Sequence, residues 1–286
     1  MRISCKVGDG VEMRFNDGAV TFYSNGGTLW PDWPEKAGID RGDVRSICVA
    51  EGKVYLSKDP KIFNLDKAIF EGLTSVVSIN MSGFDTSRVM NMGRMFGNCR
   101  SLEALDLSGF DTSHVTNMHG MFMHCTVLKD LNLRNLNTEK VTDMSHMFTG
   151  CTNLTCLDTS RFDTSRVQDM NNMFHGCQSL TDLDLSNFDT SSVTNMASMF
   201  WDCYGMQNLN LSSFDTSKVT DMPYMFYGCC ELTKLNLSRF DMSNIICMCY
   251  MFAGCQKLER IIMNAVVNGD TNINGIFLEC PAEIIG

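Results

Sequence analysis

The sequence has few prolines, few histidines and a shortage of positive charge. Its 286 residues include 5 Pro, 5 His and 23 Lys plus Arg against 33 Asp plus Glu, for a net charge of −10. Proteins that bind DNA or RNA draw much of their affinity from basic side chains set against phosphates, so this balance argues against a nucleic-acid partner. No apolar stretch reaches the roughly 18 residues of a membrane-spanning helix, so no membrane insertion is predicted.

Signals for export and for catalysis are also missing. The start, MRISCKVGDGVEMRF, lacks the apolar segment and small-residue cleavage site of a secretory signal. The 14 Cys are therefore expected to be free thiols in a reducing compartment, not a disulfide framework. The histidines fall at different repeat positions, and neither HExxH, a Gly-x-Ser-x-Gly elbow nor a phosphate-binding glycine loop occurs. The sequence predicts a protein that is not an enzyme and holds no cofactor or metal.

The abundant residues fall into a repeat. The segment GFDTSRVMNMGRMFGNC, ending at Cys99, recurs as GFDTSHVTNMHGMFMHC, ending at Cys125. Seven cysteines follow one another at intervals of 26 residues: Cys99, Cys125, Cys151, Cys177, Cys203, Cys229 and Cys255. Such a unit cannot bury its apolar side chains alone, whereas stacked units form a continuous core. The repeat therefore predicts a solenoid.

Each unit contains two apolar patterns. The spacing of Leu102, Leu105 and Leu107 is typical of the short strand of a leucine-rich repeat. The spacing of Met121, Phe122 and Cys125, one and then three residues, favours a short helix or 3-10 turn. The predicted fold class is an α/β repeat solenoid. It is a leucine-rich-repeat-like right-handed coil with short strands on one side and short helical or 3-10 arcs on the other.

The ends of the chain depart from the repeat. RISCKV, VEMRF and VTFYS are β-prone runs separated by GDG and NDG, which predicts a small antiparallel meander as an N-terminal cap over residues 1–43. The solenoid is expected over residues 44–286. Within it we expect a degenerate first coil over 44–73, regular repeats over about 74–255, and a C-terminal capping coil over 256–286.

The unit LxxLxLSxFDTSxVTNMxxMFxxC resembles the repeat of BspA-like leucine-rich-repeat surface proteins, which also occurs in mycoplasma lipoproteins. The resemblance runs from about Ile69 to Cys280, with local departures at Leu136–Glu139 and Thr159. It implies a bacterial solenoid used for protein binding, commonly in adhesion, at the cell surface or secreted. The absence of a visible signal leaves a cytoplasmic location open.

Residues repeated at one position of each coil also admit chemical interpretations. Stacked cysteines could form disulfides or bind a soft metal, but a buried Cys usually packs as a small hydrophobe, which we favour. The repeated Met pairs are likewise expected in the core. Two polar rows are expected to cap backbone N–H groups in Asx or ST turns. The first row is Asp85, Asp111, Asp163, Asp189, Asp215 and Asp241, and the second is Asn91, Asn117, Asp143, Asp169, Asn195 and Asp221.

Two surfaces remain as candidates for binding a protein partner. The first is an aromatic patch on the predicted helical side, because Trp and Tyr are enriched at interface hot spots. Its residues are Trp201, Tyr204, Tyr224, Tyr227 and Tyr250. The second is the outward face of the strands, with Asp130, Asn132, Asp158, Asp184 and Asn210. The sequence thus predicts a protein-binding solenoid. The alternatives are a structural or virion- or cytoplasm-associated scaffold without a dedicated ligand, and a metal or redox scaffold built on the cysteines.

Overall fold

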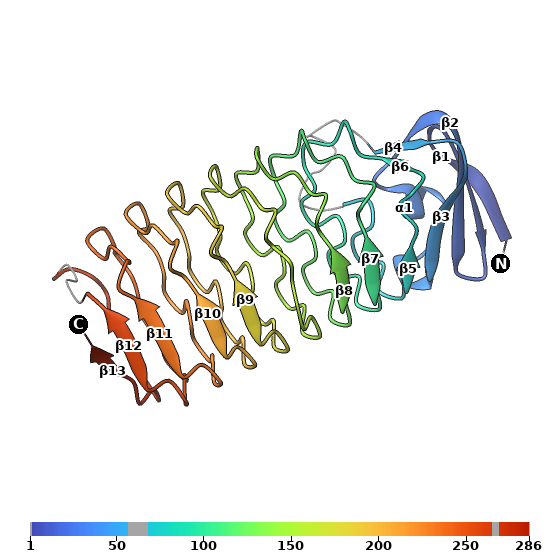
Figure 1. Cartoon of the computed structure of the whole chain (residues 1–286). Coiled ribbons are helices and arrows are strands. Elements are labelled where there is room, and N and C mark those ends of the chain that lie inside the picture. The colour runs from blue at the N-terminus through green and yellow to red at the C-terminus, as the bar shows by residue number, and fades with distance from the viewer. Residues whose placement is uncertain (1, 57–67, 265–268, 286) are drawn as a thin grey trace.

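In a computed structural model, which describes residues 2–56, 68–264 and 269–285, the chain is an elongated solenoid of about ten turns (Figure 1). The short strands lie along one side, and the N-terminal hairpin closes one end. Residues 57–67 of the expected first coil and residues 265–268 of the expected capping coil lie outside the described residues. The leucine-rich-repeat-like solenoid predicted from the sequence is confirmed.

The N-terminal segment is one long hairpin. Strands β1 (Arg2–Asn16) and β2 (Ala19–Leu29) pair antiparallel across a tight turn at Asp17 and Gly18, whose φ angles of 48° and 83° match a type I′ turn. The expectation of a break at the GDG segment is wrong, because β1 continues through it with a bulge between Asp9 and Val11. A Cβ at Gly8 would lie 2.2 Å from the Thr28 carbonyl oxygen, so this glycine permits the close approach of the two strands.

The hairpin is continuous with the solenoid sheet. Strand β2 pairs in parallel with β3 (Ser46–Glu51) and β4 (Val54–Leu56). These in turn pair with β5 (Ser78–Ile79) and β6 (Phe84–Asp85), one coil further on. Helix α1 (Trp33–Lys36) and the 3-10 turn η1 (Arg41–Asp43) lie between β2 and β3. Among the described residues, no helix has the length and apolarity needed to cross a bilayer.

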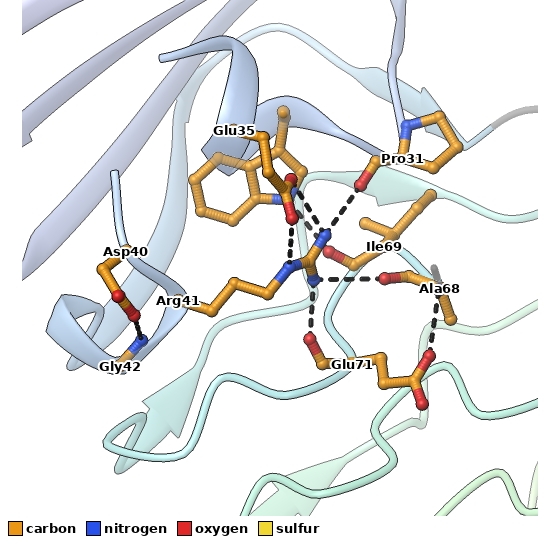
Figure 2. A network of polar contacts seen from close by, with 9 residues as sticks. Pro31, Glu35, Asp40, Arg41, Gly42, Ala68, Ile69 and Glu71 are labelled. Carbon is orange, nitrogen blue, oxygen red and sulfur yellow. Dashed lines mark hydrogen bonds and ion pairs between the residues drawn. The ribbon is translucent and has the colours of Figure 1, made fainter. Parts of the chain in front are cut away.

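Arg41 ties the N-terminal segment to the first coil (Figure 2). Its guanidinium group forms a bidentate pair with Glu35, with distances of 3.0 and 3.3 Å. The same group donates to the backbone carbonyls of Glu71 at 2.6 Å and of Pro31 at 3.1 Å. Because the planar guanidinium carries five donors, one side chain satisfies several otherwise unpaired carbonyls at this junction.

The remaining strands recur along the solenoid at no more than one per coil, and the coil between β8 and β9 has none. They are β7 (Ala104–Asp106), β8 (Asp130–Asn132), β9 (Asp182–Asp184), β10 (Asn208–Asn210), β11 (Lys234–Leu237), β12 (Arg260–Met263) and β13 (Glu283–Ile285). Neighbouring strands are parallel, and Leu105 lies opposite Leu131, 26 residues later. The predicted strand positions are therefore confirmed.

The core is built from columns of identical side chains. The phenyl rings from Phe70 to Phe277, one per coil, stack with centroids 5.4–5.8 Å apart and planes within 11° of each other. Both Met positions of each of the seven repeats, such as Met118 and Met121, have no exposed surface. The excess of Met and Phe is thus a consequence of packing, as predicted.

The predicted helical arcs are absent. The segment from Met92 to Cys99 is instead a series of turns, and two of its positions, Arg94 and Asn98, have left-handed φ angles of 54° and 60°. The same two positions are left-handed in the following coils, for example Tyr250 at 55° and Gly254 at 72°. A left-handed residue every fourth position cannot belong to a right-handed helix, although the Met and Phe spacing is that of one.

Hydrogen bonding in these turns links each coil to the next. In the first regular coil, every second N–H group donates to a carbonyl of the following coil, at 2.7–2.9 Å. These groups belong to Met92, Arg94, Phe96 and Asn98. The N–H groups of Met95, Gly97 and Cys99 donate to the carbonyl three residues back, and that of Gly93 donates to Oδ1 of Asn91. The carbonyl of Gly97 accepts from Gly72 in the preceding coil. The arc therefore satisfies its backbone without helix or sheet.

Candidate functional site

The strand face is the first predicted binding surface. Asp130, Asn132, Asp158, Asp184 and Asn210 are all exposed on it. For the last four, a side-chain oxygen accepts the backbone N–H two residues later, at 3.0–3.2 Å. Hydrogen bonds from Ser160 and from the Ser186 backbone lower the pKa of Asp158 and Asp184 respectively. These side chains thus form Asx turns and retain only part of their polar capacity for a partner.

The predicted aromatic patch exists on the turn arcs, and four of its members touch. Trp201 stacks on Tyr224, with ring centroids 5.1 Å apart, and meets Tyr227 edge-on at 5.5 Å. Tyr224 stacks on Tyr250 at 5.3 Å. We call these four residues the aromatic ridge. Tyr204 is 42% exposed and makes no ring contact with the ridge in the described part of the chain, so it stands apart from the other four.

The aromatic side chains are not required by the coil. The position of Trp201 holds Gly97, Thr149 and Ala253 in other coils, and the position of Tyr224 and Tyr250 holds Gly120 and Gly275. Tyr224 and Tyr250 also have left-handed φ angles of 57° and 55°, which disfavour bulky residues. The indole N–H of Trp201 is buried without a hydrogen-bond partner among the described residues. These features cost stability, so folding alone does not explain the ridge.

One histidine extends the ridge, and two others form a separate ring pair; none of them is among the predicted site residues. The imidazole of His175 stacks on Trp201 with centroids 4.9 Å apart, and His119 meets His146 edge-on at 5.3 Å. Burial lowers the pKa of His124, His146 and His175. These histidines occupy different positions of the repeat, so periodicity alone does not group them. Those positions lie within one short arc, which was the available signal.

The column of seven cysteines belongs to the core. Each has no exposed surface, and each thiol donates to the backbone carbonyl of the Phe 29 residues earlier at 3.0–3.3 Å. Burial raises the pKa of Cys125, Cys203 and Cys255 to about 12. All 14 cysteines are free thiols, and the described residues contain no group of three or more possible metal ligands.

The predicted Asx turns are present in both polar rows. In the first row, Oδ1 of Asp111 accepts the N–H of Ser113 at 3.0 Å, and the equivalent bond occurs at the other five positions. In the second row, Asn117 accepts the N–H of His119 at 2.9 Å. Asp221 is the exception, because Pro223, two residues later, has no N–H.

Comparison with known proteins identifies the repeat. A family described as "Mycoplasma protein of unknown function, DUF285" matches residues 63–182, 121–232 and 170–283. The chain belongs to this family. The match confirms the predicted relation to the BspA-like repeat. Among solved structures, the chain is similar to a leucine rich cell surface protein from Faecalibacterium prausnitzii A2-165, at 15% identity and a TM-score of 0.34, covering 100% of this chain and 95% of that one. No curated protein matches this member of the family.

Proposed function

We propose that this protein is a non-enzymatic protein-binding solenoid of the cell surface, and that the aromatic ridge is its main contact with a protein partner. The observation that carries the proposal is the contact group of Trp201, Tyr224, Tyr227 and Tyr250, at positions where several other coils hold small residues. Rigid aromatic side chains supply large contact area at low entropic cost, so they dominate the binding energy of many interfaces.

The repeat itself supplies variants that test the ridge. Trp201→Thr introduces the residue that Thr149 places in the same slot, and Tyr250→Gly introduces the residue of Gly275. Both are compatible with the coil, and glycine relieves the left-handed φ. We expect the double variant to fold with an unchanged or higher unfolding temperature.

Binding is measured by surface plasmon resonance against a panel of extracellular-matrix and bacterial surface proteins, with Tyr204→Ala as the matched aromatic control. We expect the double variant to lose about thirtyfold or more in affinity for the partner found, the loss typical of hot-spot residues. Full binding by the double variant would contradict the ridge as the contact surface. Absence of any partner on the panel and on intact cells would favour a structural scaffold.

A further inference from the structure

A groove crosses the strand face of the last coils, away from the aromatic ridge. It has a volume of about 490 Å³ and spans β10, β11, β12 and β13. Its lining includes Asn208, Asn210, Lys234, Asn236, Arg260 and Ile262. Every charged or amide side chain among the lining residues is a cation or a carboxamide, although the chain carries 33 acidic residues. The groove is therefore locally positive on an acidic protein.

Two cations face each other in the groove, and Glu283 lies opposite Arg260 on its other side, in the β12–β13 pair. Lys234 and Arg260 are directly opposite in the parallel β11–β12 pair, and both are exposed. Neither forms an ion pair within the described residues. Elsewhere on the strand side Arg134 pairs with Asp158 at 3.1 Å. Like charges directly opposite in a sheet are destabilising. Glu283 offsets this repulsion only from the far side of Arg260, so an anion between Lys234 and Arg260 would relieve the remaining cost.

The carboxamides add hydrogen-bond donors. Oδ1 of Asn210 accepts the N–H of Ser212 at 3.1 Å, and Oδ1 of Asn236 accepts the N–H of Ser238 at 3.0 Å. These Asx turns fix the oxygens toward the backbone. The NH₂ groups of both residues, which have no hydrogen-bond partner within the described part of the chain, are left to donate. The groove thus offers donors to a ligand rich in acceptors.

The same groove has an apolar side. Ile262 and Ile285 line it, and each is 44% exposed. Asn236 of β11 lies directly opposite Ile262, at the equivalent position of the preceding coil. Replacement of a polar residue by exposed isoleucine gains nothing for the coil in water, because its side chain points away from the core. A free phosphate or an anionic sugar chain would use the cations and leave these isoleucines uncovered.

We propose that the groove binds an extended peptide segment of a partner protein in which acidic and large apolar side chains alternate. Same-face residues of a strand lie about 7 Å apart, so the row of Lys234 and Arg260 runs beside the row of Asn236 and Ile262. An extended peptide along the solenoid axis presents alternate side chains to opposite sides, carboxylates to the cations and apolar groups to the isoleucines. Four coils at about 4.8 Å each span about 19 Å, which accommodates roughly five or six extended residues.

This binding site goes beyond the proposed function, because it shares no residue with the aromatic ridge. It is tested by fluorescence anisotropy with the full chain and a labelled hexapeptide of alternating leucine and glutamate. Two matched peptides carry glutamine in place of glutamate, or alanine in place of leucine. We expect both to bind about tenfold or more weakly than the probe, and raised salt to weaken only the glutamate peptides. Equal binding of the glutamine peptide, or no binding of the probe at millimolar protein, would overturn the proposal.

Variants on the protein assign the groove. Lys234→Asn introduces the residue that Asn208 places one coil earlier, and Ile262→Asn introduces that of Asn236, so both suit the fold. Each variant is expected to lower the affinity for the probe by about tenfold, whereas Lys218→Asn and Trp201→Thr leave that affinity unchanged. Loss of affinity with Trp201→Thr, or retention with both groove variants, would place the peptide elsewhere and refute the proposal. Inorganic polyphosphate is the last control. If it displaces the probe and binds the Ile262→Asn variant as tightly as the wild type, the groove is a general anion site and the proposal is refuted.

Discussion

The thiol of Cys125 donates a hydrogen bond to the backbone carbonyl oxygen of Phe96, in the preceding coil, over 3.1 Å. The same carbonyl accepts the N–H of Cys99 at 3.3 Å, so it has two partners and neither comes from water. Cysteine is therefore the small apolar side chain that also carries a donor to a buried carbonyl. This explains its recurrence better than packing volume alone.

Replacement of one such thiol tests this role. Cys151→Ala removes the donor to the Phe122 carbonyl and leaves a small void, so we expect a loss of about 2 kcal/mol in the free energy of unfolding. Cys156→Ala, at an exposed cysteine of the same coil, is expected to have almost no effect. Urea denaturation followed by circular dichroism measures both. Similar losses for the two variants would contradict a specific contribution from the buried thiol.

A threonine at the FDTS corner, or at the equivalent position of the Leu136–Glu139 variant, links two coils. Oγ1 of Thr138 donates to the carbonyl of Asp163 and accepts the N–H of the same residue, both at 2.8 Å. Thr138→Val keeps the shape but leaves both backbone groups unpaired, so we expect a loss of about 2 kcal/mol, again from urea denaturation. Thr138→Ser should retain most of the stability, and the exposed Thr142→Val serves as control. A silent Thr138→Val would mean that water replaces the hydroxyl.

The left-handed positions of the arc predict a second kind of effect. Gly176 has φ of 71°, and a Cβ there would come no closer than 3.6 Å to another atom, so Gly176→Ala tests backbone conformation without a clash. We expect it to cost about 1 kcal/mol. Gly109→Ala, where φ is ordinary and the space is open, should be neutral or slightly stabilising. Thermal denaturation of the pair compares them directly, and a neutral Gly176→Ala would indicate that the arc is helical in solution.

The half-buried histidines His124, His146 and His175 predict a dependence of stability on pH. Burial, and for His124 also the charge of Arg100, lowers the pKa of His124, His146 and His175 below the ordinary value of about 6.5. The unfolded chain then binds more protons, so stability falls as pH drops below about 6.5 and levels off below the folded pKa values. The Asp residues whose pKa is lowered, such as Asp163, lose their contribution only near or below about 3.9.

This dependence is measured as the unfolding temperature between pH 8 and pH 5. The triple variant with glutamine at these three histidines should flatten the curve, whereas exposed His114→Gln should leave its slope unchanged. An equal slope in the triple variant would assign the effect to other groups.

The repeat predicted the solenoid because Leu105, Met118, Phe122 and their equivalents recur at fixed intervals, and a fixed interval demands a fixed environment. It did not predict the arc correctly. The spacing of Met121, Phe122 and Cys125 fits both a helix and a chain of turns. Only the residues at the left-handed positions beside them, such as Gly120 and, one coil later, Gly150, distinguish the two.

The candidate sites were predicted unevenly for a similar reason. Subtraction of one period places Tyr224 beside Tyr250, and this contact is present. The stacking of Trp201 on Tyr224 joins different positions of the coil and lies outside the reach of simple periodicity. Lys234 and Arg260 are one period apart, yet the absence of an ion pair to either of them and the groove that they line emerge only from coordinates.

The alternating hydrogen bonds of the arcs give the molecule an electrical direction. In each peptide group such as that joining Gly97 and Asn98, the carbonyl points to the preceding coil and the N–H to the following one. The same orientation repeats along the arcs as far as Gly254, which donates to Leu278. Aligned peptide dipoles add, as they do in a helix, so the arc side carries partial negative charge at its N-terminal end and partial positive charge at its C-terminal end. Head-to-tail alignment of two such solenoids brings poles of opposite charge together, whereas contact between two N-terminal ends or two C-terminal ends brings like charges together.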